Sequence, residues 1–238
     1  DQDCDDVDQS QMIAARLYSH VCILDTGKIK CHLRGNEDVG QADVPEGTFT
    51  QVVVGDDFTC ALHDSGNIEC WGSIEELWEG NYTQITASND SFCALDNIGD
   101  VYCNEDEGKN SDREGPYLFV EQGESSTCAG RMDGELDCWG YPTPDPIHAQ
   151  LTQLAFGVNN SNCGLDQYGQ VHCNNQTAYI SRILDGYEYQ KIVAEDTEYC
   201  VLTQENEAHC FSEQRHLHSE DTFIDISIGC GLTSDGQV

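Results

Sequence analysis

Residues 51–72 read QVVVGDDFTCALHDSGNIECWG and contain the pattern that decides the fold. An apolar run at 52–54 precedes a glycine and two aspartates, and two further apolar segments follow on either side of a polar turn. Short apolar runs bounded by turn residues are typical of β-strands. The stretch therefore predicts two or three short strands joined by tight turns.

The two cysteines of this stretch, Cys60 and Cys70, fix its register if they face each other across an antiparallel pair. The symmetric pairing leaves residues 64–66 as a three-residue loop, which needs a positive φ angle at its third position. Gly66 supplies that conformation without steric cost. Facing residues of antiparallel strands lie about 4.5–5.5 Å apart, which matches the Cα separation of roughly 4.4–6.8 Å in a disulfide. Cysteine spacing and turn chemistry therefore both predict a disulfide-linked hairpin.

The same unit recurs along the chain, and most copies have a glycine at the same offset between their cysteines. The copy that starts at Cys200 has Asn206 instead, and asparagine is the next residue best able to hold a left-handed conformation. The copy that starts at Cys22 is one residue shorter and predicts a two-residue loop at 26–27. The expected hairpin disulfides are Cys22–Cys31, Cys60–Cys70, Cys93–Cys103, Cys128–Cys138, Cys163–Cys173 and Cys200–Cys210.

The two remaining cysteines lie near the two ends of the chain. The copy that begins at Cys230 stops before its second cysteine, and Cys4 is left to complete it. If the N-terminal residues take the place of the missing strand, a Cys4–Cys230 bond closes a ring inside one repeat. An alternative use of the cysteines as zinc ligands is disfavoured, because ten-residue separations across a turn differ from the CxxC pairs of zinc sites.

The recurring order of an apolar strand, a glycine, Cys-Ala-Leu, an Asp-Gly type of turn and a closing Cys-Trp-Gly resembles the regulator of chromosome condensation repeat family. The resemblance covers essentially the whole chain as degenerate copies and is clearest at residues 51–72 and 151–173. It implies an all-β fold, a single seven-bladed β-propeller domain over residues 1–238 whose first and last segments share a blade. The repeats average about 34 residues, shorter than the 40–50 usual for propellers, so some blades are expected to lack an outer strand.

The resemblance also carries expectations about function. The founding member of the family is a nuclear exchange factor for a small GTPase that sits on chromatin, which does not suit a disulfide-rich chain of net charge −34. Secreted bacterial propellers of similar type, including a β-lactamase inhibitor, bind a protein across one face of the ring. The resemblance therefore implies a protein partner, although no inhibitor contact residue can be matched in this sequence.

The charge of the chain restricts its partners. It has 44 acidic and 10 basic residues, for a formal net charge of −34. Repulsion from phosphate groups argues against nucleic acid or an anionic membrane as a partner. The acidic surface is interpreted either as a solvated coat suited to a salty habitat or as a means of recruiting cations or a basic protein. Because no run of eighteen apolar residues occurs, no membrane insertion is expected.

The disulfides predict the compartment. Bonds in such number require an oxidising environment, so the protein is expected to be secreted, extracellular, periplasmic or on the cell surface. The chain begins at Asp1 without a methionine or a signal-peptide pattern, as expected of a mature exported product. In a eukaryotic source, Asn-X-Ser/Thr sequons are candidates for glycosylation. These candidates are Asn81, Asn89, Asn159 and Asn175.

Two groups of side chains are candidates for metal binding. Residues 1–8 alternate acidic side chains as calcium loops do, but they lack the glycine and the closing glutamate of an EF-hand. His172 and His209 occupy the same repeat position, and His216 and His218 point one way if they lie on a strand. Two histidines do not make a site, so exposed polar positions are the preferred interpretation. The calcium candidates are Asp1, Asp3, Asp5, Asp6 and Asp8, and no other cofactor is expected.

One connection between repeats has a different pattern. Residues 73–80 place Ile74, Leu77 and Trp78 at helical spacing. This spacing predicts one short helical turn after the clearest repeat.

Function is less constrained than fold. The sequence shows no nucleophile, base and acid set and no phosphate-binding loop, and its carboxylates are too numerous for one pair to stand out. The leading hypothesis is a non-catalytic extracellular module for protein interaction or structure, and its partner is another protein or a second copy of the chain. The alternatives are a subunit of a head-to-tail filament formed by exchange of the N-terminal segment, a secreted enzyme inhibitor, and an enzyme with its active site in the central funnel of the propeller.

Overall fold

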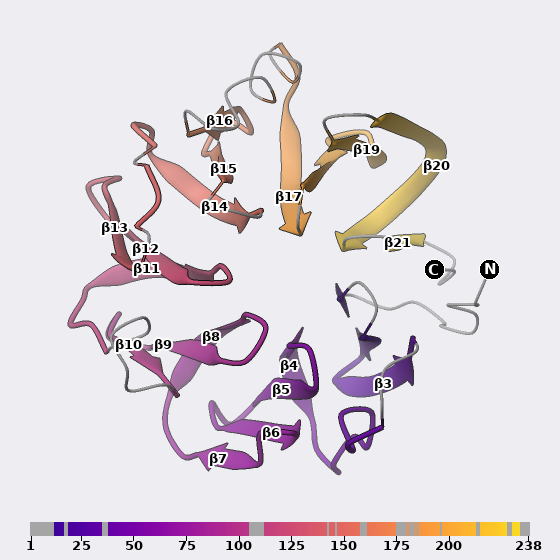
Figure 1. The fold of residues 1–238 in the computed structure, drawn as a ribbon, viewed down its shortest axis with the longest axis vertical. Coiled ribbons are helices and arrows are strands. Elements are labelled where there is room, and N and C mark those ends of the chain that lie inside the picture. The colour runs from indigo at the N-terminus through magenta and orange to yellow at the C-terminus, as the bar shows by residue number, and fades with distance from the viewer. Residues whose placement is uncertain are drawn as a thin grey trace.

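Small antiparallel sheets are arranged radially around a common centre (Figure 1). Successive sheets follow the chain around this centre, so that β1 and β21, near the two ends of the described chain, lie next to each other. The computed structural model describes residues 12–16, 19–34, 38–104, 112–141, 143–145, 147–157, 161–174, 180, 184, 186–195, 197–212, 215–227 and 230–233.

Each sheet begins with a strand at the centre and adds its next strands outward (Figure 1). The innermost strands are β1 (Met12–Ala15), β4 (Phe49–Val54), β8 (Tyr82–Ala87), β11 (Tyr117–Gln122), β14 (Leu151–Phe156) and β17 (Tyr189–Glu195). The second strands are β2 (His20–Asp25), β5 (Phe58–His63), β9 (Phe92–Asp96), β12 (Ser126–Arg131), β15 (Asn162–Asp166) and β18 (Glu198–Thr203). The third strands are β3 (Lys28–Leu33), β6 (Ile68–Gly72), β10 (Val101–Cys103), β13 (Leu136–Gly140), β16 (Val171–Cys173) and β19 (Glu207–Ser212).

The strand β20 (Arg215–Ser227) serves two neighbouring units. Its first part pairs with β19 as an outer strand, and residues 223–227 pair with β21 (Cys230–Thr233) as an innermost strand does with its second strand. A fourth strand, β7 (Glu76–Trp78), covers the edge of β6. In the described chain, β17 to β21 form one continuous five-stranded sheet through β20, and four sheets have three strands, which agrees with the expected absence of outer strands from some short repeats.

The hairpin register predicted from the cysteines is confirmed. Cys60 faces Cys70 and Leu62 faces Ile68, and the intervening turn has a φ angle of 88° at Gly66. The glycines at the same offset also have positive φ angles, and Asn206 replaces them with a φ angle of 69°. The shorter first hairpin closes through the expected two-residue loop, with positive φ angles at both of its residues, as a type I′ turn requires.

Disulfides link the second and third strands of these hairpins, and their Cα atoms are 4.0–4.1 Å apart. The backbone N–H of His63 donates to the carbonyl of Asn67 (2.8 Å), so these two residues form a hydrogen-bonded pair. Hydrogen-bonded and non-hydrogen-bonded pairs alternate along antiparallel strands, and Cys60 and Cys70 therefore form a pair of the closer, non-hydrogen-bonded type. The bonds are Cys22–Cys31, Cys60–Cys70, Cys93–Cys103, Cys128–Cys138, Cys163–Cys173 and Cys200–Cys210, the pairs that the repeat predicts. The expected Cys4–Cys230 bond lies outside the described side chains.

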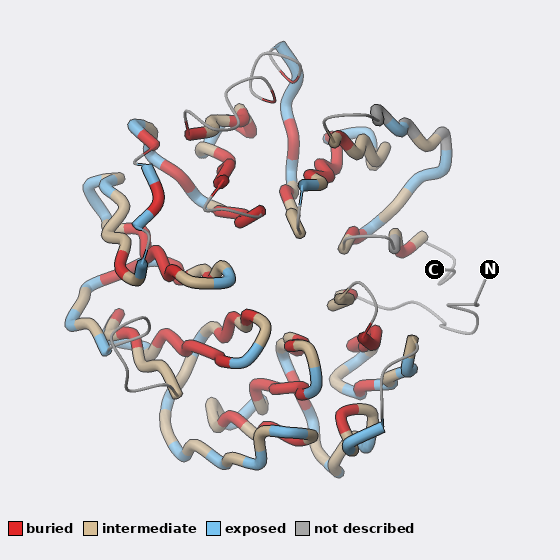
Figure 2. The backbone as a smooth tube through the Cα atoms, viewed as in Figure 1, coloured by how far each residue is buried: buried red, intermediate tan, exposed pale blue. Residues whose placement is uncertain are grey.

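The hydrophobic core consists of layers between neighbouring sheets. Buried residues follow the inner and second strands around the ring (Figure 2). Phe92 of β9, for example, packs in one cluster with Phe58 and Ile68 of the preceding sheet. Leu232 of β21 packs against Ile13 of β1, so the last described strand shares a layer with the first. The sheets therefore stabilise one another laterally.

The helical turn predicted for residues 73–80 is wrong. Residues 76–78 form β7, whose Leu77 faces Glu69 of β6. Trp78 packs against Phe92 of the next sheet, with ring centroids 4.6 Å apart. Spacing of three and four residues suits a helix, but here the exposed edge of β6 supplies hydrogen bonds to an extended segment, and this tertiary pairing decides the conformation.

Candidate functional site

A cavity of about 380 Å³ is lined by the innermost strands of the sheets. These strands converge at the centre of the ring (Figure 1). The cavity lining comes from β1, β4, β8, β11, β14 and β17 and from Ser227 of β20. Volumes of this order are typical of sites for small ligands. The side chains along this central cavity and on its two faces are therefore the candidate functional groups.

A glutamine recurs as the third residue of an innermost strand and ties that strand to the next one. Gln51 of β4 donates from Nε2 to the carbonyl of Ile85 (2.7 Å) and accepts from the Ile85 N–H at Oε1 (2.9 Å). Gln84 of β8 makes the same two bonds with Val120 of β11 (3.0 and 3.1 Å). Each amide side chain therefore satisfies both backbone groups of a residue in the next sheet.

The third residue of the innermost strand is still a glutamine on β14, but on β17 it is a lysine that forms an ion pair with β20. Gln153 of β14 still donates to the carbonyl of Gln190 (2.8 Å) and accepts from the N–H of Ile192 (3.3 Å). On β17 the position is Lys191, whose Nζ donates to the carboxylate of Asp225 on β20. Asp225 is only 6% exposed, whereas the Lys191 side chain is about 30% exposed, so the carboxylate is the shielded partner of this pair.

The carboxylate of Asp225 also bonds to β1, at the other end of the chain. Its Oδ2 accepts from the N–H of Ile13 (2.9 Å), a residue in the same strand position as Ile85. Ser227 adds a second contact, because its Oγ accepts from the N–H of Ala15 (3.1 Å). The junction between β20 and β1 therefore uses the same kind of bond as the junction between β4 and β8.

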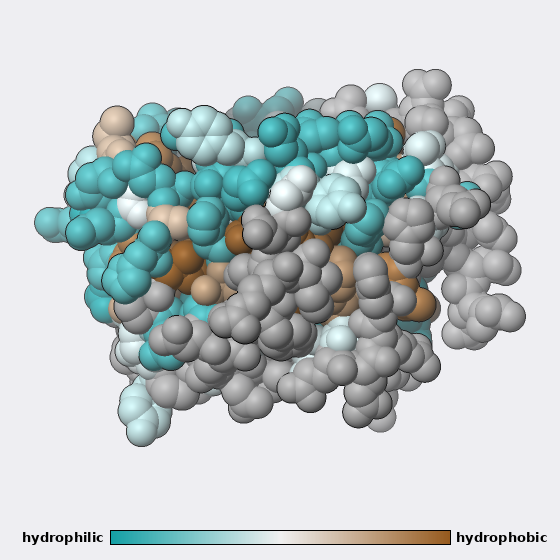
Figure 3. Space-filling view, turned by 90° about the horizontal axis from the view of Figure 1, so that it is seen from above, coloured by the Kyte–Doolittle hydropathy of each residue, from teal (hydrophilic) through white to brown (hydrophobic). Residues whose placement is uncertain are grey.

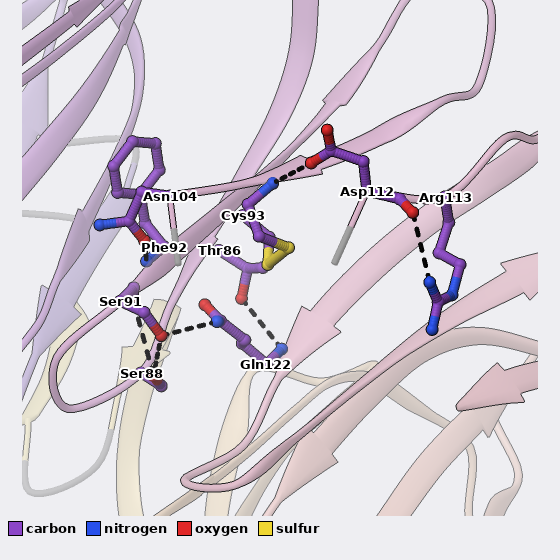
Figure 4. Close-up of a disulfide and its surroundings, with 10 residues drawn as sticks. Thr86, Ser88, Ser91, Phe92, Cys93, Asn104, Asp112, Arg113 and Gln122 are labelled. Carbon is purple, nitrogen blue, oxygen red and sulfur yellow. Dashed lines mark hydrogen bonds between the residues drawn. A yellow bond between two sulfur atoms is a disulfide. The ribbon is translucent and has the colours of Figure 1, made fainter. Parts of the chain in front are cut away.

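A second tier of polar contacts joins β8 to β11. Thr86 Oγ1 donates to Glu121 Oε1 (3.1 Å) and accepts from the N–H of Gln122 (3.2 Å). Gln122 Nε2 donates to Ser91 Oγ (2.9 Å), which in turn lies 2.9 Å from Ser88 Oγ. Figure 4 shows Thr86, Gln122 and the two serines directed toward one another beside a disulfide. The buried junction between these sheets is thus polar as well as apolar.

Glu121 brings a carboxyl group to the wall of the central cavity. Burial raises its pKa to about 7, and the hydrogen bonds from Thr86 and from the backbone of Gln122, together with the charge of Lys191, oppose that shift. Lys191 is already paired with Asp225. In the described part of the chain, no cation lies within ion-pair distance of Glu121.

Arg16 spans one mouth of the cavity. Its Nε donates to Asp56 Oδ1 (2.6 Å) and lies 3.7 Å from Glu195 Oε1, and its Nη2 donates to Asn89 Oδ1. These partners follow or end β4, β17 and β8. One guanidinium group therefore ties the first sheet to three others.

The face around Arg16, called here the acidic face, is formed by the turns between first and second strands. Arg16 is the only cation in the part of these turns that the structure describes. The carboxylates of the same turns are Asp56, Asp57, Asp90, Glu124 and Glu195. This face therefore attracts positive charge.

The opposite face, called here the hairpin face, is formed by the turns between second and third strands and by the starts of the innermost strands. It exposes large apolar side chains on successive sheets, and carboxylates such as Asp133 and Glu188 lie next to them in the sequence. We call this set the apolar arc: Ile98, Leu118, Met132, Tyr168, Tyr187 and Ile224. At the edge of the ring, by contrast, hydrophilic residues cover much of the described surface visible in Figure 3.

His20 belongs to the interior and not to an accessible site. It is fully buried, with Nδ1 2.7 Å from Ser19 Oγ and Nε2 2.6 Å from Thr59 Oγ1. Burial, with a smaller contribution from the charge of Arg16, lowers the pKa of His20 to about 4. Its imidazole is therefore neutral near pH 7 and joins the first sheet to the second.

The structure places two of the glycosylation candidates. Asn81 is exposed at the start of β8. Asn89 is partly buried, its side-chain oxygen accepts a bond from Arg16, and the serine of its sequon, Ser91, is only 1% exposed. Asn159 and Asn175 lie outside the described residues.

The structure separates His172 from His209, but it pairs the backbone of His209 on β19 with that of His218 on β20. His172 bonds to Asp166 Oδ2 (2.8 Å) within one hairpin, and His209 lies in another sheet. The side chains of His216 and His218 lie outside those described. So do the calcium candidates Asp1, Asp3, Asp5, Asp6 and Asp8. Across the side chains that are described, no group of three or more His, Cys, Asp or Glu residues has metal-binding geometry.

The sequence does carry a signal for the inner glutamines. Phe-Thr-Gln-Val, Tyr-Thr-Gln-Ile and Leu-Thr-Gln-Leu occur at 49–52, 82–85 and 151–154, the same position of three repeats. The repeated Thr-Gln before an aliphatic residue indicates that the glutamine has a shared role. The roles of Arg16 and Glu121 had no such signal, because their partners come from strands far apart in the chain.

Comparison with known proteins agrees with the repeat pattern. Residues 49–73 match the family model described as the regulator of chromosome condensation (RCC1) repeat. The chain contains an RCC1 repeat. This RCC1 repeat comprises β4, β5 and β6 and includes Gln51 and the Cys60–Cys70 disulfide. No curated protein matches the chain at a significant level of sequence similarity.

Solved structures of low sequence identity share the fold. The entire ectodomain of the receptor kinase CR4 from Physcomitrella patens has a TM-score of 0.73 and 19% identity, covering 90% of this chain and 68% of its own. The CRINKLY WD40 ectodomain of the Arabidopsis thaliana receptor kinase ACR4 has a TM-score of 0.63 and 19% identity, with 82% and 76% covered. Prp20p from Saccharomyces cerevisiae has a TM-score of 0.65 and 14% identity, with 84% and 71% covered. The chain with the RCC1 repeat is therefore a β-propeller in architecture.

Helices long enough to cross a membrane are absent from the described ranges. Within them, no helix combines the length and the apolar character needed to span a bilayer.

Proposed function

We propose that this propeller is an extracellular protein-binding module whose apolar arc binds a basic protein. The carrying observation is the hairpin face, where exposed side chains such as Met132 (73% exposed) and Tyr168 (70% exposed) project from successive sheets. Aromatic and methionine side chains are enriched in protein interfaces and supply much of their binding energy. A net charge of −34 complements a cationic partner and repels polyanions.

The comparisons support binding of a protein without identifying it. Two similar structures are ectodomains of receptor kinases, and the third protein, Prp20p, has binding properties toward Gsp1p and histones. The disulfides of successive hairpins favour an oxidising compartment. Within such a compartment, Asn81 is the better placed of the two described sequons, because its side chain is exposed.

We further infer that the ring has seven blades and closes within one molecule. The bonds from Asp225 to Ile13 and from Ser227 to Ala15 support this inference, because they repeat the junctions found between other sheets. In this arrangement, residues near Cys4 complete the blade of β21. Non-reducing electrophoresis tests it: a single band near 26 kDa supports closure within one chain, and a ladder of multiples supports exchange into a filament.

Affinity capture from extracellular fluid tests the binding proposal. The bait is the oxidised protein, compared with the variants Tyr168→Ser and Tyr141→Ser. Tyr141 is 84% exposed but lies on the acidic face, so it is a matched control. We expect the unchanged bait and Tyr141→Ser to capture basic proteins and Tyr168→Ser to fail to capture them. High salt should release the captured proteins. Capture that is insensitive to Tyr168→Ser, or restricted to acidic proteins, would overturn the proposal.

A further inference from the structure

The central cavity contains a carboxylate that the apolar arc does not involve. Glu121 borders the cavity on β11, whereas the arc lies on the outer surface of the hairpin face. We propose that the central cavity binds a primary alkylammonium group, with the Glu121 carboxylate as its counterion. This site is additional to the protein-binding surface and does not depend on it.

Two carboxylates of the described cavity wall, Glu121 and Glu124, have no counterion in an ion pair, and Glu121 is the more enclosed of the two. Lys191 is paired with Asp225, and Arg16 is paired with Asp56 at the mouth. The donors that bond to Glu121 in the described part of the chain, the Thr86 hydroxyl and the Gln122 backbone, are uncharged. A carboxylate that is shielded from bulk water gains more from a cation than an exposed one does.

The remaining lining favours an organic cation over a metal ion. Val53, Phe119, Ala155 and Val193 contribute apolar surface to the same cavity as Glu121. Calcium requires six to eight oxygen ligands, and the described side chains hold no cluster of even three metal-binding groups. An ammonium group needs one carboxylate and few acceptors, and its alkyl chain packs against the apolar lining. A volume of about 380 Å³ accommodates a ligand of this kind.

The ionisation of Glu121 gives the site a second signature. Its pKa lies near 7, mainly because of burial. Two described side chains from neighbouring strands act on the Glu121 carboxylate. Lys191 on β17 carries a charge, and Thr86 on β8 contributes a neutral hydroxyl group. The fraction of ionised Glu121 then rises about tenfold between pH 6 and pH 8, and cation affinity rises with it.

Calorimetric titration of the oxidised full chain with hexylammonium tests the proposal, and hexanol serves as an uncharged probe of similar shape. We expect hexylammonium to bind at least about tenfold more tightly than hexanol, with an affinity about tenfold higher at pH 8 than at pH 6. A short peptide with a single central lysine is then used as a competitor. If the peptide displaces hexylammonium, the cavity binds lysine side chains as well as free amines. If the peptide does not displace hexylammonium, the cavity binds free amines alone.

Matched charge variants locate the site. Glu121→Gln keeps the shape of the side chain and is expected to weaken hexylammonium binding at least about tenfold. Glu135→Gln removes the same charge from an exposed hairpin turn and is expected to leave affinity unchanged. Circular dichroism confirms that both variants are folded. Equal affinity of Glu121→Gln and the unchanged protein, or no preference for hexylammonium over hexanol, would overturn the proposal. Neither result bears on capture through Tyr168.

Discussion

At the scale of single residues, Glu121 couples the cavity to the stability of the fold. Its side chain is surrounded by protein but partly accessible to the cavity, and its pKa of about 7 lies well above the ordinary 4.5. When the pKa of a carboxyl group is higher in the folded state than in the unfolded state, its contribution to the free energy of unfolding is fully present below the unfolded-state pKa. That contribution is lost as pH rises through the folded-state pKa. The penalty on the native state therefore builds up from about pH 4.5 and is complete above about pH 7.

The substitution Glu121→Gln removes that penalty. We expect the variant to be more stable than the unchanged protein at pH 8, by about 1–3 kcal/mol, with the difference vanishing near pH 4.5. Urea unfolding of the oxidised proteins at both pH values measures it. Glu135→Gln, in an exposed turn, should change stability little at either pH. A difference that grows as pH falls would contradict the argument.

A second prediction concerns the turn at 26–27. Thr26 has a φ angle of 45°, which is unfavourable for a β-branched residue, while Gly27 accepts its φ angle of 80° easily. Asn-Gly is a preferred sequence for this turn type. Thr26→Asn should therefore raise the free energy of unfolding by roughly 1 kcal/mol. Thr26→Val, which keeps the branched shape, should give no gain, and thermal unfolding distinguishes the two.

At the scale of elements, the hairpins followed from the sequence and the junctions between them did not. The hairpin register followed from the spacing of Cys60 and Cys70 and from the glycine in the turn, because local geometry alone decides it. The strand at 76–78 was missed, because its conformation depends on the free edge of β6. The cavity wall was missed for the same reason: Glu121 acquires its environment from β8 and β17, which no local pattern relates to it.

The inner glutamines give the junctions a measurable strength. Gln84→Ala removes the side-chain bonds to the carbonyl and N–H of Val120, at a cost of about 1–3 kcal/mol. Hydrogen exchange at the Val120 amide should accelerate by more than exchange in unrelated sheets. Gln150→Ala is the control, because Gln150 is exposed and its side chain bonds to the carbonyl of Asp133 in a turn. Equal losses of stability in the two variants would mean that the hydrogen bonds between sheets stabilise the fold no more than an exposed bond to a turn does.

At the scale of the whole molecule, repulsion among 44 acidic side chains opposes compaction. Each hairpin disulfide closes a loop of about ten residues and contributes roughly 2–3 kcal/mol in the chain-entropy model. The described bonds together contribute on the order of 15 kcal/mol at most, against typical net stabilities of about 5–15 kcal/mol. Crosslinking and charge are therefore the two opposing terms that set the stability of the ring.

Full reduction should therefore unfold the protein at low ionic strength. Near-ultraviolet circular dichroism of the reduced and alkylated chain should lose its fine structure. Because salt screens the repulsion between carboxylates, added sodium chloride should restore part of the fold and should raise the melting temperature of the oxidised form. A reduced protein that keeps its near-ultraviolet spectrum in low salt would show that lateral packing of the sheets suffices.

The bond between Ile13 and Asp225 joins residues 212 positions apart, and this separation has a consequence for biosynthesis. At about 5–20 residues per second, a ribosome needs roughly 10–40 seconds to translate the stretch between them. During that interval β1 has left the ribosome without its final neighbour. Strand β1 is thus among the last strands to complete its native contacts, although it is translated before the other described strands, and its edge lacks its final neighbour until β20 has been made.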